Sequence, residues 1–124
     1  MYLLDTNTVI DFCNSKLPLN AKNFLIDIEP TISVITNIEI FASAKIPANE
    51  LKTLQSFVKI ATIYDEIDSE IVAKSIEIRQ KYKIKLPDAI IGATALVNNL
   101  TLVTRNISDF DGIEGLEIIN PYNL

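Results

Sequence analysis

The chain has 124 residues, of which 48% are hydrophobic and 22% are charged, so it is long enough to form one domain with its own apolar core. It contains no histidine, which excludes serine–histidine and cysteine–histidine catalysis, histidine-based zinc sites and cleavage of RNA by imidazole. Because the net charge is −5, the field of the whole chain does not attract nucleic acid, and such binding needs a local basic patch or a metal ion.

Five short runs of apolar and β-branched residues predict strands, and helical patterns lie between them. In chain order, the expected elements are strand 2–4, helices 6–13 and 20–28, strand 31–34, helices 36–44 and 49–60, strand 61–64, helix 69–82, a helix from Pro87, and strands 101–104 and 116–119. The strands are almost continuously apolar, as in a parallel sheet that is covered on both faces. We therefore predict an α/β fold with three layers, α/β/α, around a central, mostly parallel five-stranded sheet.

Four carboxylates fall where strands end or helices begin, at the edge where open parallel sheets bind ligands. They are Asp5, Glu39, Asp88 and Asp109. Each has a structural explanation when it is taken alone. Asp5 can cap a helix, and Glu39 can form a capping box with Thr36. Asp88 suits a helix start and Asp109 a solvated turn.

Taken together, the four acids need a further explanation. Ser, Thr or Asn cap a helix about as well as Asp, so capping does not account for an acid at every point. Neighbouring carboxylates repel one another unless a cation neutralises them, and hard oxygen ligands favour Mg²⁺ or Mn²⁺. Such ions activate water and support in-line displacement at phosphorus without any histidine.

Four sequence blocks carry a family resemblance: LLDTN, TNIEI, LPDAIIGATA and LVTRNISDF, in this order from residue 2 to about residue 119. They resemble the motif blocks of the PIN domain and, more narrowly, those of the VapC toxin ribonucleases of type II toxin–antitoxin pairs. The resemblance implies a Mg²⁺-dependent endoribonuclease, with Mn²⁺ as a possible substitute, that hydrolyses RNA phosphodiesters with metal-activated water. It also implies a homodimer and a cognate antitoxin protein that wraps each chain.

The same resemblance assigns roles to individual residues. The four acids are expected to be catalytic, with Asp5 and Asp88 as metal ligands. Many family members carry an acid where Asn106 stands, while others have the TRN..DF form of this chain, so Asp109 is the expected fourth acid. Support for the metal or the phosphate is expected from Thr6, Thr104 and Asn106.

The run RQKYKIK at residues 79–85 concentrates basic side chains just before Asp88. One interpretation places these cations at a helix C-terminus, where the helix dipole favours them. The other interpretation is an RNA-binding group that grips phosphates beside the metal site, with Tyr82 available to stack on a base. Both remain open for the four basic residues concerned, Arg79, Lys81, Lys83 and Lys85.

Two other functions also remain open. DTNTV after the first strand loosely resembles the start of haloacid-dehalogenase-like phosphatases, but Asn7 stands where these enzymes need a second Asp as acid–base. The other alternative is a catalytically weak PIN fold that binds RNA or a protein partner.

The cysteine content and the N-terminal sequence together indicate the cellular compartment. The single cysteine, Cys13, excludes a disulfide framework and suits a reducing cytosol. MYLLDTN lacks the basic start of a secretory signal, and no apolar run reaches the roughly 18 residues that a membrane-spanning helix needs. We therefore expect a cytoplasmic protein with a single nuclease domain over residues 1–124 and no membrane partner.

Overall fold

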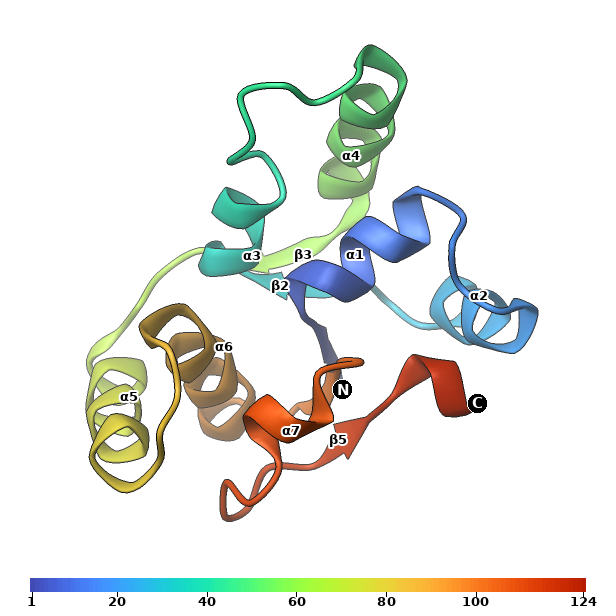
Figure 1. The fold of residues 1–124 in the computed structure, drawn as a ribbon. Coiled ribbons are helices and arrows are strands. Elements are labelled where there is room, and N and C mark those ends of the chain that lie inside the picture. The colour runs from blue at the N-terminus through green and yellow to red at the C-terminus, as the bar shows by residue number, and fades with distance from the viewer.

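The computed structural model describes residues Met1–Leu124, and short strands alternate with helices throughout (Figure 1). The strands are β1 (Tyr2–Leu4), β2 (Thr31–Ser33), β3 (Thr62–Tyr64), β4 (Thr101–Val103) and β5 (Ile118–Ile119). The helices are α1 (Thr6–Cys13), α2 (Leu19–Asp27), α3 (Val34–Glu39), α4 (Ala48–Ile60), α5 (Ser69–Lys81), α6 (Leu86–Val97) and α7 (Ile107–Phe110). A 3-10 turn, η1 (Pro121–Asn123), lies at the end of the chain.

All strand pairs are parallel, as the continuous apolar runs predict. β1 pairs with β4, and β4 pairs with β5, whereas β2 and β3 form a ladder of their own. β1 also lies beside β2, which gives the spatial order β3, β2, β1, β4, β5. The five predicted strands are thus present and parallel, but they are divided between two hydrogen-bonded ladders. The strands are only two or three residues long, and β1 and β2 meet side by side without a hydrogen-bonded ladder.

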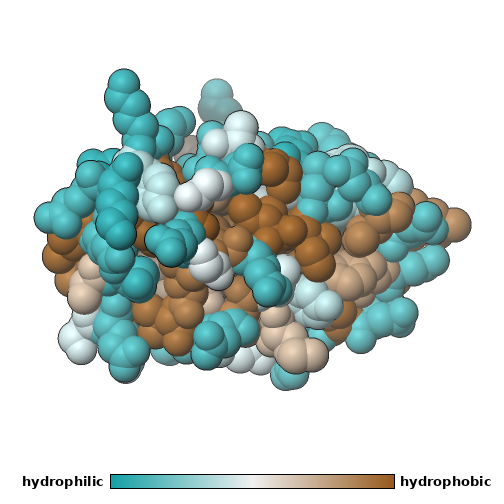
Figure 2. Space-filling view, turned by 90° about the horizontal axis from the view of Figure 1, so that it is seen from below, coloured by the Kyte–Doolittle hydropathy of each residue, from teal (hydrophilic) through white to brown (hydrophobic).

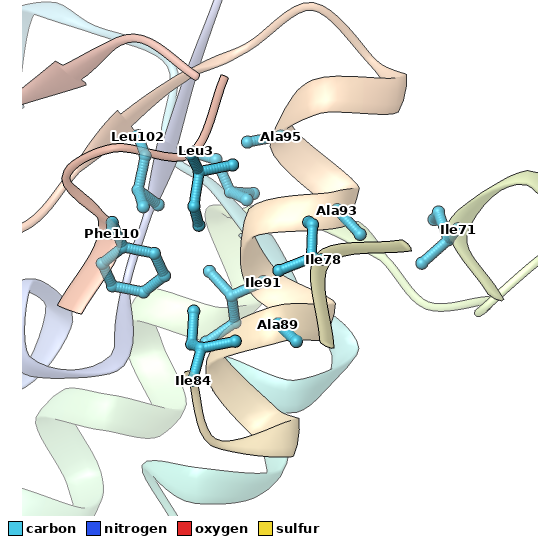
Figure 3. Close-up of a cluster of buried hydrophobic side chains, with 11 residues drawn as sticks. Leu3, Ile71, Ile78, Ile84, Ala89, Ile91, Ala93, Ala95, Leu102 and Phe110 are labelled. Carbon is cyan, nitrogen blue, oxygen red and sulfur yellow. The ribbon is translucent and has the colours of Figure 1, made fainter. Parts of the chain in front are cut away.

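Two apolar clusters lie on opposite faces of the strands. Leu3 and Leu102, which are opposite each other in the β1–β4 ladder, join the cluster of α5 and α6 (Figure 3). Leu4 and Val103, the next pair along, join the cluster of α1, α2 and α4. Because successive strand residues point to opposite faces, β1 and β4 separate two helical layers. The predicted three-layer α/β/α architecture is confirmed.

Helix α6 is buried along most of its length because it is built from small and apolar residues. Ala89, Ala93 and Ala95 are fully buried, and Ile91 points from α6 toward the strand residues in Figure 3. The one buried hydroxyl on this helix, at Thr94, donates to the carbonyl of Ile90 at 2.7 Å, so it needs no outside partner. Packing against both α5 and the strands fixes the helix whose first turn carries Asp88.

Two parts of the chain differ from the sequence prediction. Helix α3 begins at Val34 and ends at Glu39, and not at 36–44, because the Ser33 hydroxyl caps it by accepting the N–H of Thr36 at 3.2 Å. Thr36 is therefore not a cap, and the capping box with Glu39 is wrong. Helix α7 and turn η1 were not predicted, since elements of three or four residues show no helical periodicity.

Hydrophobic side chains also reach the surface, as Figure 2 shows for the face that is seen from below. A groove of about 520 Å³ runs along α5 and the start of α6. Its apolar lining includes four exposed or half-exposed side chains: Ile67, Val72, Ile76 and Leu86. None of the helices combines the length and the apolar character that crossing a bilayer requires.

The packing of α6 makes a testable prediction. Ala93→Leu inserts a larger side chain at a fully buried position, and we expect it to lower the free energy of unfolding by about 1–3 kcal/mol. The matched control is Ala73→Leu on the exposed side of α5, where Leu and Ala have similar helix propensities. Urea denaturation compares the two variants, and equal stabilities would show that α6 is not tightly packed.

Candidate active site

The four predicted acids line one cavity of about 250 Å³. Its walls come from the start of α1, the end of α3, the start of α6 and the segment after β4. Because β1 and β4 are parallel neighbours, their carboxyl ends lie at the same edge and bring the first and last of these segments together. The polar and charged residues of the lining are Asp5, Thr6, Asn7, Glu39, Lys85, Asp88, Asn106 and Asp109.

Asp5 is the most enclosed of the four acids, with only 4% of its surface exposed. It caps α1, as its structural explanation requires, because one carboxylate oxygen accepts the N–H of Thr8 at 2.9 Å. The other oxygen accepts the hydroxyl of Thr104. Burial raises the pKa of Asp5, and these hydrogen bonds offset part of that effect. Asp5 thus both caps α1 and lines the cavity.

Glu39 is held by the hydroxyl group of Thr6, which also contacts the hydroxyl of Thr36. Thr6 Oγ1 lies 2.5 Å from Glu39 Oε1, to which it donates, and 3.2 Å from Thr36 Oγ1. Thr6 therefore joins the start of α1 to α3, although the two threonines are thirty residues apart in the chain. The structure places both predicted hydroxyl groups, those of Thr6 and Thr104, on carboxylates of the cavity.

Asp88 lies in the first turn of α6 and its side chain makes no capping hydrogen bond; the residue at the cap position is Lys85. Burial raises the pKa of Asp88, and repulsion from Asp109, Glu39 and Asp5 raises it further. Lys85 acts in the opposite direction. The four carboxylates therefore interact electrostatically, although they come from four different segments.

Both candidates for the fourth position lie at the cavity. Asn106 precedes α7, and its backbone N–H donates to Thr104 Oγ1 at 3.0 Å. Asp109 follows within the single turn of α7, whose brief helical course brings its side chain back to the same lining. The unpredicted helix α7 is thus the element that places Asn106 and Asp109 side by side at the site.

The donor set fits a hard divalent cation by its chemistry. Carboxylate and amide oxygens are the ligands that Mg²⁺ and Mn²⁺ prefer, and the cavity lining provides four of the first kind and two of the second. No three of the acids lie close enough together to form a ready-made cluster. Like charges with no cation between them are more stable apart.

The basic run divides into residues with different neighbours. Lys85 lines the acidic cavity, and Lys83 is exposed in the link between α5 and α6. Lys81 forms a surface ion pair with Glu77 at 3.4 Å. Only part of the run therefore lies at the acids.

Two further residues of the segment 79–85, Arg79 and Tyr82, contribute to the connection between α5 and α6. Arg79 Nη1 donates to the carbonyl of Ile84 at 2.5 Å, which ties the end of α5 to the linking segment. Tyr82 is half-buried against the α5–α6 cluster, and its hydroxyl accepts the N–H of Glu114 at 3.1 Å. Packing occupies much of the Tyr82 ring that base stacking would use.

Asn7 lines the cavity, yet sequence reasoning gave it no role there. Its amide was considered only as a departure from the phosphatase pattern. Its position two residues after Asp5, at the junction of β1 and α1, is the signal that identifies it.

Comparison with known proteins identifies the family of this chain. The sequence profile of the PIN domain matches residues 2–115. The chain belongs to the PIN-domain family. The resemblance predicted from the four motif blocks is confirmed, and PIN-domain membership removes the basis for the phosphatase alternative.

Solved structures resemble this PIN domain over nearly its whole length. A toxin–antitoxin complex from Klebsiella pneumoniae contains a chain with 39% identity and a TM-score of 0.79, with 98% of both chains covered. VapBC2 from Rickettsia felis, bound to a DNA fragment from its promoter, has 27% identity and a TM-score of 0.78 over 96% of this chain and 97% of that one. DNA-bound VapBC from Salmonella typhimurium, at 24% identity and a TM-score of 0.78 over 97% of each chain, shares the fold. No curated protein sequence matches the chain.

The electrostatics of this PIN-domain site predict a stability change. The pKa of Asp88 is raised by folding, so its ionisation opposes the folded state. This penalty is absent below the ordinary pKa of 3.8, grows as the pH rises from 3.8 to the folded pKa, and is constant above the folded pKa. Asp88→Asn should therefore raise the melting temperature at pH 7, and the gain should shrink as the pH falls toward about 4.

Circular dichroism measures both melting curves, with Asp65→Asn as a control that removes the same charge from an exposed loop. A melting temperature that is lowered by Asp88→Asn at pH 7 would contradict the conclusion that burial and repulsion penalise the ionised Asp88.

Proposed function

We propose that this PIN domain is a Mg²⁺-dependent endoribonuclease and the toxin of a type II toxin–antitoxin pair, with residues 1–124 forming one nuclease domain. The observation that supports this most directly is that four carboxylates from four segments line one cavity and interact electrostatically. The 39% identity to a chain in a toxin–antitoxin complex supports the biological context.

Asp5 and Asp88 would hold the ion, with Glu39 and Asp109 completing the acidic lining. When bound, Mg²⁺ or Mn²⁺ supplies activation of water and stabilises the charge that develops on the phosphate. The groups around it fix the acids: the Thr104 hydroxyl and the Thr8 backbone N–H orient the two oxygens of Asp5.

The RNA backbone would lie along the cavity on the side of Lys85. Because the chain carries a net charge of −5, phosphate binding depends on local cations. Lys85 is the cation in the cavity lining, and exposed Lys83 precedes it by two residues. These two lysines form the phosphate-binding edge, while Asn7 and Asn106 offer amide hydrogen bonds inside the cavity.

The partners follow from charge and from the relatives. An anionic cavity attracts a cationic side chain, so an antitoxin would block the site with an Arg or Lys that competes with the metal. The Klebsiella relative is described as part of a toxin–antitoxin complex. This chain would accordingly act as a homodimer in the cytoplasm, with a cognate antitoxin on each subunit.

The acids provide the first test of the nuclease proposal. Asp5→Asn and Asp88→Asn should each lower the rate of RNA cleavage by at least about 100-fold, because even the outer partners of metal ligands contribute 10- to 100-fold. EDTA should abolish cleavage by the unmodified protein, and Asp65→Asn should leave it unchanged. Mass spectrometry of the products should show 5′-phosphate and 3′-hydroxyl ends.

Cleavage that persists in excess EDTA, or in either acid variant, would contradict the metal-dependent mechanism. A 2′,3′-cyclic phosphate would indicate attack by the ribose hydroxyl instead. RNA binding without cleavage in Mg²⁺ and in Mn²⁺ would favour the alternative of a PIN fold that only binds.

The lysines of the basic run provide the second test. Lys85→Ala should weaken RNA binding and reduce the slope of log K against log salt by about 0.7, the value for one phosphate contact on a single strand. Lys81→Ala is the matched control, since Lys81 already pairs with Glu77 on the surface. Filter binding at several salt concentrations measures both. Equal slopes for the two variants would refute the assignment of Lys85 to phosphate.

Partner binding is tested with the purified chain and with its genetic neighbour. Light scattering should give about twice the chain mass of 13.8 kDa. Co-expression with the adjacent reading frame should yield a complex in which RNA cleavage is suppressed. A monomer at micromolar concentration would contradict the homodimer, and a neighbour that neither binds nor suppresses cleavage would contradict the antitoxin.

A further inference from the structure

A buried carboxylate outside the cavity has no role in the function proposed so far. Asp11 lies in α1 with 4% of its surface exposed. One of its oxygens, Oδ2, accepts hydrogen bonds from Arg105 Nη1 at 2.9 Å and from the Tyr122 hydroxyl at 2.8 Å. These donors follow Asp11 by 94 and 111 residues, and together they provide the pairing that a buried charge requires.

Arg105 occupies a sensitive position beside the acids. Its neighbours in the chain are Thr104, whose hydroxyl donates to Asp5, and Asn106, which lines the cavity. Arg105 does not line the cavity, since its guanidinium pairs with Asp11, although its charge is near enough to lower the pKa of Asp5 slightly against the larger effect of burial. Its side chain is 45% exposed, so the contact with Asp11 is the main restraint on a group that is otherwise open to solvent.

A guanidinium is a strong competitor for carboxylates. It presents donors in a planar fork that binds a carboxylate through two hydrogen bonds, and it stays charged at every physiological pH. Asn106, the next residue in the chain, lines the cavity that the four carboxylates make anionic. If Arg105 were released from Asp11, it would have a nearby alternative in the cavity, where it would neutralise the charge that attracts a cation.

We propose that Asp11 is a positioning residue that holds Arg105 outside the acidic cavity and so keeps the four carboxylates available to a divalent cation. The proposal rests on the metal-binding part of the proposed function. The ion pair acts by restraint: Asp11 itself touches neither the cavity nor the substrate.

The C-terminal turn contributes to this restraint. Tyr122 lies in η1, and the Asn120 side chain accepts its backbone N–H at 3.0 Å. The Leu124 carbonyl accepts the side-chain amide of Asn20 at 3.2 Å, which ties the end of the chain to α2. The Tyr122 hydroxyl is thereby held against Asp11, where it fixes the orientation of the carboxylate that Arg105 binds.

The test measures Mn²⁺ binding by titration calorimetry, which needs no RNA and no activity. Asp11→Asn preserves shape but removes the charge, and it should weaken Mn²⁺ binding by about tenfold or more, a typical effect for groups that act on metal ligands through others. Arg105→Gln should bind Mn²⁺ at least as tightly as the unmodified protein, because a competing cation is gone. The double variant should therefore recover the affinity that Asp11→Asn loses.

Asp27→Asn is the matched control, since it removes the same charge from an exposed position at the end of α2. Unchanged affinity in Asp11→Asn would overturn the proposal. So would a double variant that is as weak as Asp11→Asn, because the ion pair would then only support the fold. If the unmodified protein fails to bind Mn²⁺, all the variants fail alike and the metal proposal itself is wrong.

Circular dichroism establishes that each variant is folded before titration. If Asp11→Asn does not fold, Tyr122→Phe takes its place, because it removes one hydrogen bond and leaves the carboxylate intact. The expected loss of Mn²⁺ affinity is then about twofold or more, and Arg105→Gln should again cancel it. No loss in Tyr122→Phe would overturn the proposal.

Discussion

Electrostatic repulsion among four carboxylates is the constraint on which the architecture of this PIN domain depends. Ionised side chains that share a cavity destabilise the fold that brings them together; burial first, and repulsion from the other three acids second, raise the pKa of Asp88. Each acid stands on a separately packed segment, and this packing offsets the repulsion among the acids. Asp88 stands on the buried helix α6, Asp5 at the end of the central strand β1, and Glu39 at the end of the capped helix α3.

Neutral donors hold these acids, and this choice has a chemical consequence. A hydroxyl orients a carboxylate oxygen without cancelling its charge, whereas an arginine or lysine in the same place would neutralise the site. Thr104 orients Asp5, and Thr6 orients Glu39. The one arginine in this part of the chain, Arg105, is paired with Asp11 away from the cavity. With one lysine, Lys85, among four carboxylates in the lining and the guanidinium of Arg105 outside it, the cavity keeps a net negative charge.

Local patterns in the sequence predicted the elements and the edge at which the acids meet, because strand and helix periodicities depend on neighbouring residues. The same patterns could not predict which side chains meet across the chain. The bonds from Thr6 to Glu39 and from Arg105 to Asp11 join residues that are 33 and 94 positions apart. The capping box at Thr36 failed for a related reason: Ser33, three residues earlier, offered an equivalent hydroxyl and the helix began there. In the sequence the basic residues 79–85 form one group, yet in the structure Lys81 pairs with Glu77 whereas Lys85 lines the cavity.

Because β1 and β2 share no hydrogen-bonded ladder, the strands form two separate ladders that meet at the cavity. β1 continues into Asp5 and belongs to one hydrogen-bonded ladder; β2 leads into α3 and Glu39 and belongs to the other. Side-chain packing and the Thr6 hydroxyl join them, and such contacts open more readily than a ladder of backbone bonds. A ligand that engaged Asp5 and Glu39 together would bridge the two ladders and stabilise the folded chain by mass action. Under the proposed function, the lifetime of this protein against cellular proteases would then follow the supply of divalent cation, so that a metal-starved cell would degrade the nuclease sooner than a replete one.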